Sequence, residues 1–266
     1  MGVLNVTPDS FSDGGFYLEL ELAAERALEM ERAGADILDV GGESTRPGSE
    51  GISAEEELGR VLPVLDRLCG RLKIPISIDT QKATVAERAI AAGAELINDV
   101  TALRTEPKLA EVARRHRLPL ILMHMRGVPR TMQKRPFARN VVRDVISGLR
   151  AAVARARKAG IAKSQILLDP GIGFGKSYEQ NCELLARLPE LAGLGCPLVV
   201  GTSRKSFIGH LLGDAPPEER LWGTAATVAA SILAGAHIVR VHDIVEMVQV
   251  VRVTDAVLSA RLAGAP

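Results

Sequence analysis

The chain alternates short apolar runs with longer amphipathic runs from one end to the other. Each short run has the length and continuous apolar character of a buried strand, whereas each long run repeats its apolar positions with the helical period. The runs predicted to be strands are 3–6, 36–40, 74–78, 96–100, 119–123, 166–169, 197–200 and 237–241. The runs predicted to be helices are 20–33, 54–72, 83–92, 109–115, 141–159, 179–188, 218–234 and 244–262.

Eight alternating units of this kind predict an α/β fold, a single (β/α)8 TIM barrel that spans residues 1–266. Four glycines reinforce the pattern because each follows a predicted helix, where a left-handed cap is expected: Gly34, Gly93, Gly160 and Gly235. A doubly wound nucleotide-binding sheet is the structural alternative. The even spacing of the units and the lack of a Gly-x-Gly-x-x-Gly motif after the first strand disfavour it.

Charge and cysteine content narrow the class of partner and the compartment. The formal net charge is only +1, so no long-range field would attract nucleic acid or an anionic membrane. Three cysteines without Cys-x-x-Cys spacing, and an N-terminus unlike a signal peptide, predict a cytoplasmic protein. No apolar run reaches the ~20 residues of a membrane-spanning helix, so no membrane partner is expected.

The segment 166–176 is unusual because a buried strand ends in a carboxylate. Pro170 stops further ladder pairing after Asp169, and three glycines precede Lys176. An unpartnered buried carboxylate is costly, so Asp169 either caps the next helix or waits for a ligand that supplies hydrogen-bond donors. Both interpretations remain open from this segment alone, and Lys176 is expected to be a solvated residue at the start of a helix.

Most of the predicted strands end in polar side chains, and in a barrel these ends converge at one mouth. Asp79, Asn98 and Asp169 offer carboxylate and amide groups, and the apolar Met123 and Phe174 lie at neighbouring ends. This combination suits a flat, donor-rich heterocycle whose N–C–NH2 edge pairs with a carboxylate through two parallel hydrogen bonds. For each polar residue taken singly, a turn or a helix cap explains its position equally well.

A second set of residues at the mouth predicts an anion site. Arg240 and His242 alternate along the last strand, so both point to one side of it, and Arg46 and Lys205 come from other loops. Phosphate sites in these barrels often follow the last two strands, and arginine suits phosphate oxygens. Asn5 could supply a neutral oxygen to a Mg2+ that also bridges the anion. The alternative for His242 is a structural histidine.

Two loops over the mouth, 7–16 and 43–53, are rich in small and polar residues. Such segments are candidate lids that exclude water when they close, and flexible surface turns are the ordinary alternative.

Several long motifs make the chain similar to a known family. It resembles the bacterial dihydropteroate synthases, enzymes of the folate pathway, nearly from end to end. The motifs include Asp-Val-Gly-Gly-Glu-Ser-Thr-Arg-Pro-Gly at 39–48 and Asp-Pro-Gly-Ile-Gly-Phe-Gly-Lys at 169–176. Further matching segments are 5–15, 78–80, 97–100, 122–125, 201–206 and 240–243. Only the shorter Asp-Pro-Gly and Asn-Asp-Val elements would also suit related pterin-binding methyltransferase domains.

The resemblance implies condensation of 6-hydroxymethyl-7,8-dihydropterin pyrophosphate with p-aminobenzoate to give 7,8-dihydropteroate and pyrophosphate. It implies that the pterin is bound by Asp79, Asn98, Met123, Asp169 and Lys205. Pyrophosphate and Mg2+ would be bound by Asn5, Arg240 and His242, with Asn5 as the metal ligand. The p-aminobenzoate pocket would comprise Thr45, Pro47, Phe174, Lys205 and Ser206, completed on loop closure by Phe11, Asp13 and Arg46.

The same resemblance implies catalysis by positioning and electrostatics and a homodimer formed through the last helices. The residues expected to be catalytic are Asp79, Asp169, Lys205, Arg240 and His242. Cationic groups and Mg2+ would stabilise the departing pyrophosphate, while carboxylates favour positive charge on the pterin methylene. The weakly basic amine then needs little deprotonation, so no general base is expected.

Two other functions are weighed against this one. A catalytically silent pterin-binding protein would need no leaving-group site, so Asn5, Arg240 and His242 argue against it. A corrinoid-linked domain that binds methyltetrahydrofolate is disfavoured by the Ser-Thr-Arg-Pro-Gly and Ser-Arg-Lys-Ser motifs. The chain departs from the family in one respect, because Met1 and Gly2 directly precede the first strand where a longer segment is usual. The start is therefore expected to be either later than usual or incomplete.

Overall fold

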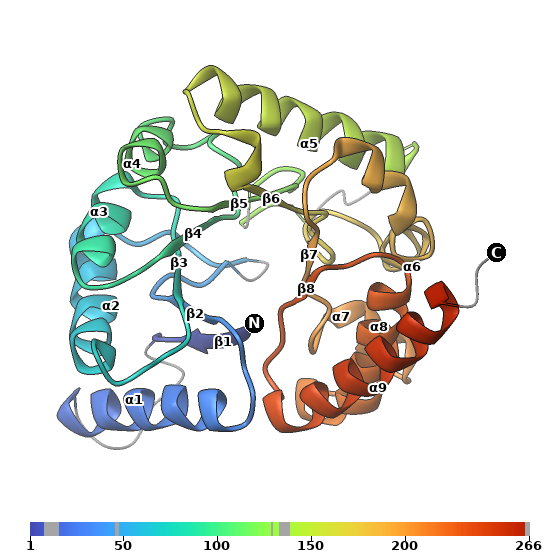
Figure 1. Ribbon diagram of the computed structural model, residues 1–266, viewed down its shortest axis with the longest axis horizontal. Helices are drawn as coiled ribbons and strands as arrows, with labels where there is room; N and C mark the ends of the chain where they lie inside the picture. The colour runs from blue at the N-terminus through green and yellow to red at the C-terminus, as the bar shows by residue number, and fades with distance from the viewer. Residues whose placement is uncertain (8–15, 46–47, 129, 133–138, 264–266) are drawn as a thin grey trace.

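The computed structural model describes residues 1–7, 16–45, 48–128, 130–132 and 139–263 (Figure 1). In these ranges strands and helices alternate as predicted. The strands are β1 (Gly2–Asn5), β2 (Leu38–Gly41), β3 (Ile76–Asp79), β4 (Leu96–Asp99), β5 (Leu120–Met123), β6 (Ile166–Asp169), β7 (Val199–Val200) and β8 (Ile238–Val239). All of their pairings are parallel.

The strands form a closed ring. β1 to β6 make one sheet in chain order, and β7 and β8 make a second pair. Isolated parallel bridges between Leu168 and Leu198, and between Gly2 and Val241, join the two groups on both sides. The backbone N–H of Val3 also donates to the carbonyl of Val241 at 3.1 Å. The prediction of a (β/α)8 barrel is therefore confirmed, with strands inside and helices outside (Figure 1).

The outer layer contains the predicted helices and a short additional one. They are α1 (Phe16–Arg32), α2 (Ala54–Leu68), α3 (Ala83–Ala91), α4 (Leu109–His116), α5 (Val141–Lys158), α6 (Tyr178–Ala186), α7 (Ser206–Leu211), α8 (Leu221–Leu233) and α9 (Ile244–Ala263). Short 3-10 turns η2 (Lys163–Gln165), η3 (Leu188–Leu194) and η4 (Pro217–Glu219) connect some of them. The predicted helix at 218–234 starts late because Pro217–Glu219 forms the turn η4. None of the described helices is long and apolar enough to cross a membrane.

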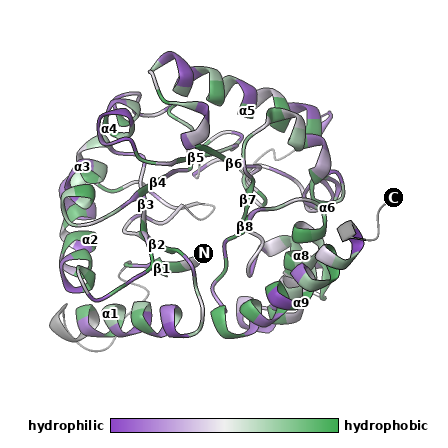
Figure 2. Cartoon of the chain, viewed as in Figure 1, coloured by the Kyte–Doolittle hydropathy of each residue, from purple (hydrophilic) through white to green (hydrophobic). Residues whose placement is uncertain are grey.

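Strand alternation divides the core into two layers. Leu38 and Val40 face outward, where they join the large apolar cluster packed against the helices. Inside the barrel, the lower layer is apolar and contains Met1, Ile121, Val199, Ile37, Leu167 and Ile238. Higher along the same inner faces the side chains become polar, for example Asp39, Asn98 and Asp169, all buried. The strands are largely hydrophobic, whereas the helices carry both hydrophobic and hydrophilic residues (Figure 2). The buried polar side chains of the inner faces therefore lie towards the C-terminal ends of the strands, at the mouth of the barrel.

Candidate active site

The polar layer of the mouth is organised around one arginine. Arg240 follows β8, and its Nε donates to Oδ2 of Asp39 at 2.7 Å. Its Nη2 donates to Oδ2 of Asp79 at 3.0 Å. Nδ2 of Asn98 also donates to Oδ2 of Asp39, at 3.1 Å. Asp39, to which sequence reasoning assigned no role, thus connects Asn98 to Arg240, and Arg240 in turn binds Asp79.

The network places two carboxyl groups, those of Asp39 and Asp79, beside a single guanidinium. The pKa of Asp79 is raised to about 8, first by burial and then by the nearby Asp39, while Arg240 opposes the shift. Asp39 is fully buried, and its Oδ1 has no hydrogen-bond partner among the described residues. A buried acceptor without a donor costs free energy, so a ligand that brings N–H groups would be favoured here. Asp79 does not cap α3, whose N-cap is Lys82.

Asp169 lies at the end of β6, in register with Met123 on β5. Its Oδ1 accepts a hydrogen bond from the backbone N–H of Gly171 at 2.6 Å. Burial raises the pKa of Asp169, and the positive charges of Lys205 and Arg240 partly offset that effect. The helix-cap interpretation is wrong, because α6 is capped by Ser177. Asp169 instead orders its own loop while it stands at the mouth.

Asp99, which ends β4, serves local structure. Its Oδ1 accepts from the backbone N–H of Thr101 at 2.8 Å, and its Oδ2 accepts from that of Leu103 at 2.6 Å. Both carboxylate oxygens are therefore used to form the turn after β4. Asp99 therefore forms a turn, whereas its neighbour Asn98 donates into the network around Arg240.

An apolar patch lies beside the polar network. Val100, Met123, Met125 and Met132 form a small buried cluster on which the half-buried Phe174 packs. Nζ of Lys205 lies 4.1 Å from the centre of the Phe174 ring, within the range of a cation–π contact. Ser206 is the first residue of α7 and directly follows Lys205. The predicted residues Phe174, Lys205 and Ser206 thus come together.

His242 is held by Ser203 and is not a source of positive charge at neutral pH. Its Nδ1 lies 2.9 Å from Oγ of Ser203, and its backbone N–H donates to the same oxygen at 3.2 Å. The pKa of His242 is lowered to about 4, first by burial and then by the charge of Arg240. Among the members of the predicted cationic cluster that the structure describes, Arg240 and Lys205 therefore supply the charge, while His242 offers a neutral imidazole.

The comparisons with known proteins agree with this geometry. A family model described as "Pterin binding enzyme" matches residues 1–242. A dihydropteroate synthase from Synechocystis sp. is 50% identical over 256 residues, which cover 96% of this chain and 89% of that protein. The chain belongs to the dihydropteroate synthase family. The predicted family, enzyme class and function are thereby confirmed.

Solved structures of the family extend the agreement to the whole fold. A dihydropteroate synthase from Clostridium difficile, solved in the presence of pteroic acid, has a TM-score of 0.91 and 45% identity and covers 97% of this chain and 95% of that one. The Xanthomonas albilineans enzyme with 4-aminobenzoic acid has a TM-score of 0.91 and 44% identity, covering 100% and 93% of the two chains. The barrel and its mouth are therefore a family feature.

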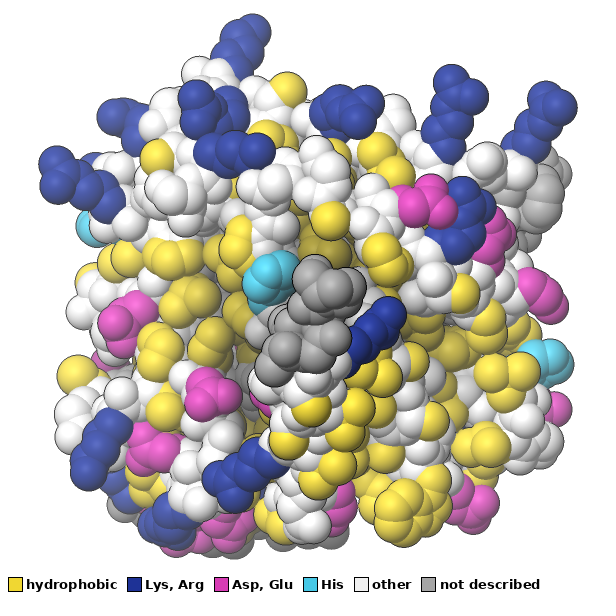
Figure 3. All heavy atoms as spheres, turned by 45° about the vertical axis from the view of Figure 1, so that its right-hand side comes forward, with side chains coloured by type: hydrophobic (Ala, Val, Ile, Leu, Met, Phe, Trp, Pro, Cys, Tyr) yellow, Lys and Arg dark blue, Asp and Glu magenta, His cyan; other side chains and the backbone are white. Residues whose placement is uncertain are grey.

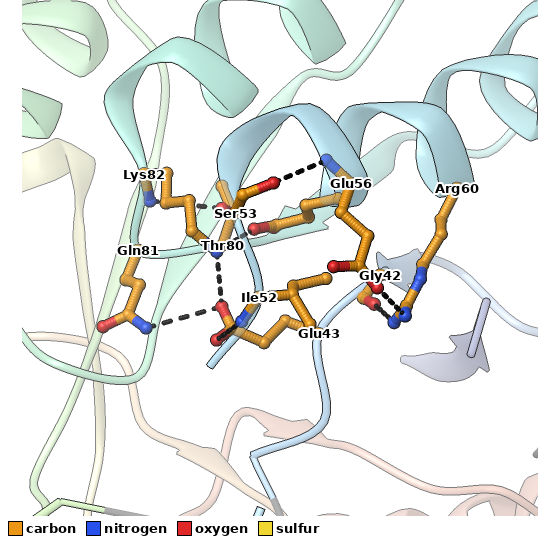
Figure 4. A network of polar contacts seen from close by, with 10 residues as sticks. Gly42, Glu43, Ile52, Ser53, Glu56, Arg60, Thr80, Gln81 and Lys82 are labelled. Atoms are coloured by element: carbon orange, nitrogen blue, oxygen red, sulfur yellow. Dashed lines mark hydrogen bonds and ion pairs between the residues drawn. The ribbon is translucent and has the colours of Figure 1, made fainter. Parts of the chain in front are cut away.

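Part of the predicted p-aminobenzoate pocket lies on the segment 43–53. Phe11, Asp13, Arg46 and Pro47 lie outside the described residues. Thr45 lines a cavity of ≈ 330 Å3 together with Glu43, Gln81, Val100 and Thr101. Glu43 fixes both ends of the segment, because its carboxylate accepts from Nζ of Lys82 at 2.7 Å and from the backbone N–H of Ile52 at 3.3 Å (Figure 4).

The prediction that Lys176 is solvated is wrong. Its side chain is only 1% exposed, and its Nζ donates to the carbonyl oxygens of Gly171 at 2.8 Å and Phe174 at 3.1 Å. The backbone folds back over the side chain because Gly171, Gly173 and Gly175 all have positive φ. Lys176 is therefore part of the structure that supports the mouth.

Proposed function

We propose that this mouth performs the family's condensation with a division of labour among the described residues. The observation that carries the proposal is the position of Arg240, which contacts two buried carboxylates while Lys205 lies over Phe174. The carboxylates of Asp79 and Asp169 would take the N–C–NH2 edge of the pterin through charge-assisted hydrogen bonds. The ring of Phe174 would pack on p-aminobenzoate.

The chemical step would be driven by electrostatics. The bond between the pterin methylene and the pyrophosphate oxygen breaks, the amine of p-aminobenzoate forms the new C–N bond, and its proton leaves to solvent. A guanidinium has five N–H donors, so Arg240 can retain both carboxylates and still donate to the leaving pyrophosphate. Asp169, together with Asp79 when it is ionised, would favour positive charge on the pterin, and the neutral His242 would donate a hydrogen bond to pyrophosphate.

The direct test is pyrophosphate release from the purified chain supplied with Mg2+, dihydropterin pyrophosphate and p-aminobenzoate. Release that depends on p-aminobenzoate is expected, and a mixture without the amine is the control. Tight pterin binding with no pyrophosphate above background would favour the alternative of a silent pterin-binding protein. Methyl transfer from methyltetrahydrofolate to a corrinoid would favour the other alternative.

Mg2+ is proposed to arrive with the pyrophosphate. The described residues contain no group of three or more His, Cys, Asp or Glu side chains that could hold a metal ion on their own. Asn5, half-buried at the end of β1, fits as one neutral oxygen ligand of an ion held mainly by phosphate oxygens and water. When bound, the ion would neutralise charge on the leaving group.

Replacing Asn5 by alanine tests that assignment. We expect the gain in pyrophosphate affinity on adding Mg2+ to shrink by about tenfold, which corresponds to about 1.4 kcal/mol, while affinity without the ion changes little. Calorimetric titration of pyrophosphate with and without Mg2+ measures both. An equal loss under the two conditions would show that Asn5 contacts pyrophosphate itself and does not hold the ion.

A homodimer through the last helices is proposed from an exposed apolar surface. On α8 and α9, which pack together, Trp222 is 80% exposed and Val253 is 67% exposed. Val257 on α9 and Leu211 at the end of α7 are also exposed, and hydrophobic side chains gather on this side of the molecule (Figure 3). Exposed apolar surface of this kind commonly marks an interface, and the resemblance names a second copy as the partner.

Val253→Glu is expected to convert the dimer to a monomer at micromolar concentration, because it places a charge in an apolar contact. Sedimentation velocity measures the change. The matched control is Leu22→Glu on α1, an exposed apolar residue that does not belong to the last helices and should leave the dimer intact. A dimer that persists in the Val253 variant would place the interface elsewhere.

The three free cysteines are consistent with the cytoplasmic location that we also propose.

A further inference from the structure

A lysine that the proposed chemistry does not use lies buried beneath the mouth. Lys176 connects the loop after β6 to the end of β5. Besides the carbonyl oxygens of Gly171 and Phe174, its Nζ lies 3.2 Å from Nδ1 of His124. The carbonyl oxygen of His124 lies 3.4 Å from the same Nζ, so four acceptors surround one ammonium group and each of its three N–H donors has a partner. Such a buried arrangement holds its neighbours in place, because each donor would be costly to leave unpaired.

His124 has the properties of a fixed acceptor. Burial lowers its pKa to about 3, so the imidazole is neutral, and its Nε2 lies 3.6 Å from Oδ2 of Asp144. We assign the ring proton to Nε2, which leaves the lone pair of Nδ1 facing Lys176. Burial also lowers the pKa of Lys176 to about 7. Even a neutral amine keeps two N–H donors, enough for the two nearer carbonyl oxygens, those of Gly171 and Phe174.

The loop that Lys176 holds has little freedom to move. The backbone N–H of Phe174 donates to the carbonyl of Gly171 at 3.0 Å, which closes a turn. Gly171 has φ +70°, and a Cβ added there would lie 1.9 Å from the carbonyl oxygen of His124. The N–H of Gly173 is bound by Oδ1 of Asn181 at 2.6 Å. The backbone of Gly171 therefore packs directly on that of His124, and Lys176 holds the turn through its hydrogen bonds to Gly171 and Phe174.

The other side of this turn is the proposed p-aminobenzoate surface. The ring of Phe174 faces Nζ of Lys205, and a Cβ at Gly173 would come within 3.0 Å of Cδ of Lys205. We infer that Lys176 is a positioning residue for p-aminobenzoate. Its hydrogen bonds to the carbonyls of Gly171 and Phe174 fix the position of the Phe174 ring relative to Nζ of Lys205. This inference rests on the proposed function and adds a residue that touches neither substrate.

Steady-state kinetics of Lys176→Met test the inference. Loss of the donors should raise the KM for p-aminobenzoate about tenfold or more, since small misplacements of binding groups are costly. The KM for dihydropterin pyrophosphate should rise by a clearly smaller factor, because Asp79 and Asn98 lie outside the loop that Lys176 holds and only Asp169 shares Gly171 with it. A merely structural lysine would instead reduce the fraction of folded enzyme, which lowers kcat and leaves both KM values unchanged. That result would overturn the inference.

Two further variants sharpen the test. The double variant Phe174→Leu, Lys176→Met should have a KM for p-aminobenzoate less than about twofold above that of Phe174→Leu alone. The reason is that the effects of two coupled residues do not add. Full multiplication of the two effects would also overturn the inference. The matched control is Lys163→Met, an exposed lysine in η2 before β6, which should change neither KM.

If Lys176→Met does not fold, Lys176→Gln, which keeps an N–H2 donor, is measured against the same criteria. Wild-type pyrophosphate release is established first. Its absence would refute the proposed function, whereas unchanged KM values in an active background would refute only the role of Lys176.

Discussion

Arg240→Met is expected to lower synthase turnover by about 100-fold to 1000-fold, the loss seen when a preorganised electrostatic group is removed. The same change should reduce the free energy of unfolding by about 3–5 kcal/mol, because it leaves a buried ion pair without its cation. Asp39 is fully buried, and Asp79 is 11% exposed, so neither carboxylate can be solvated in place. Pyrophosphate release and urea unfolding measure the two effects.

Two comparisons separate charge from geometry at Arg240. Arg240→Lys keeps the positive charge but loses the planar fork that reaches both carboxylates, so part of the stability but little of the activity should return. Arg67→Met removes an arginine whose partner, Glu21, lies at the surface, and should cost less than about 1 kcal/mol. If Arg240→Met kept the stability and the turnover of the wild type, Arg240 would be needed neither for catalysis nor for the stability of the fold.

The fold could be predicted from the sequence because periodicity acts over each element independently. Strand and helix runs differ in period, and eight repeats leave few arrangements open. Boundaries were less predictable where local geometry decides them. The helix predicted to reach residue 72 ends at Leu68, before Gly70 with φ +71°, and the six residues of α7 are too few to show a period.

The site was predictable where its residues end strands and less so elsewhere. Asp79, Asn98 and Asp169 were found because barrel strand ends converge. Asp39 lies inside its strand, although the outward apolar pair Leu38 and Val40 already implies that the residue between them faces inward. The alternation of inward and outward side chains along this strand could therefore have identified Asp39 as a residue of the site.

Lys176 was not predictable in this way. Its burial depends on contacts with His124, 52 residues away in the sequence, and on glycine turns whose approach no local pattern encodes. Buried polar contacts between loops that are distant in sequence are set by the tertiary fold. Local periodicity in the sequence therefore could not indicate that this lysine is buried.

Asp169→Asn is expected to weaken pterin binding by about 1.5–3 kcal/mol, or about 10-fold to 150-fold, the scale of a hydrogen bond to a charged group. The variant is well suited to the question because the amide oxygen can still accept from the N–H of Gly171 and so preserve the loop. Titration calorimetry with a pterin ligand measures the affinity. Native-like folding with unchanged pterin affinity would exclude the assigned role.

Stability should move in the opposite sense from binding in Asp169→Asn. Burial raises the pKa of Asp169 in the folded protein, so its ionised form opposes folding increasingly as the pH rises above the unfolded pKa. A neutral asparagine removes that penalty, so the variant should be as stable as wild type or more stable at pH 8. Asp99→Asn is the matched control: burial raises the pKa of Asp99 too, but both of its oxygens accept backbone donors, and an amide with one oxygen leaves a buried N–H without an acceptor. It should lose stability and keep its pterin affinity, which would separate a ligand-binding carboxylate from one that only forms a turn.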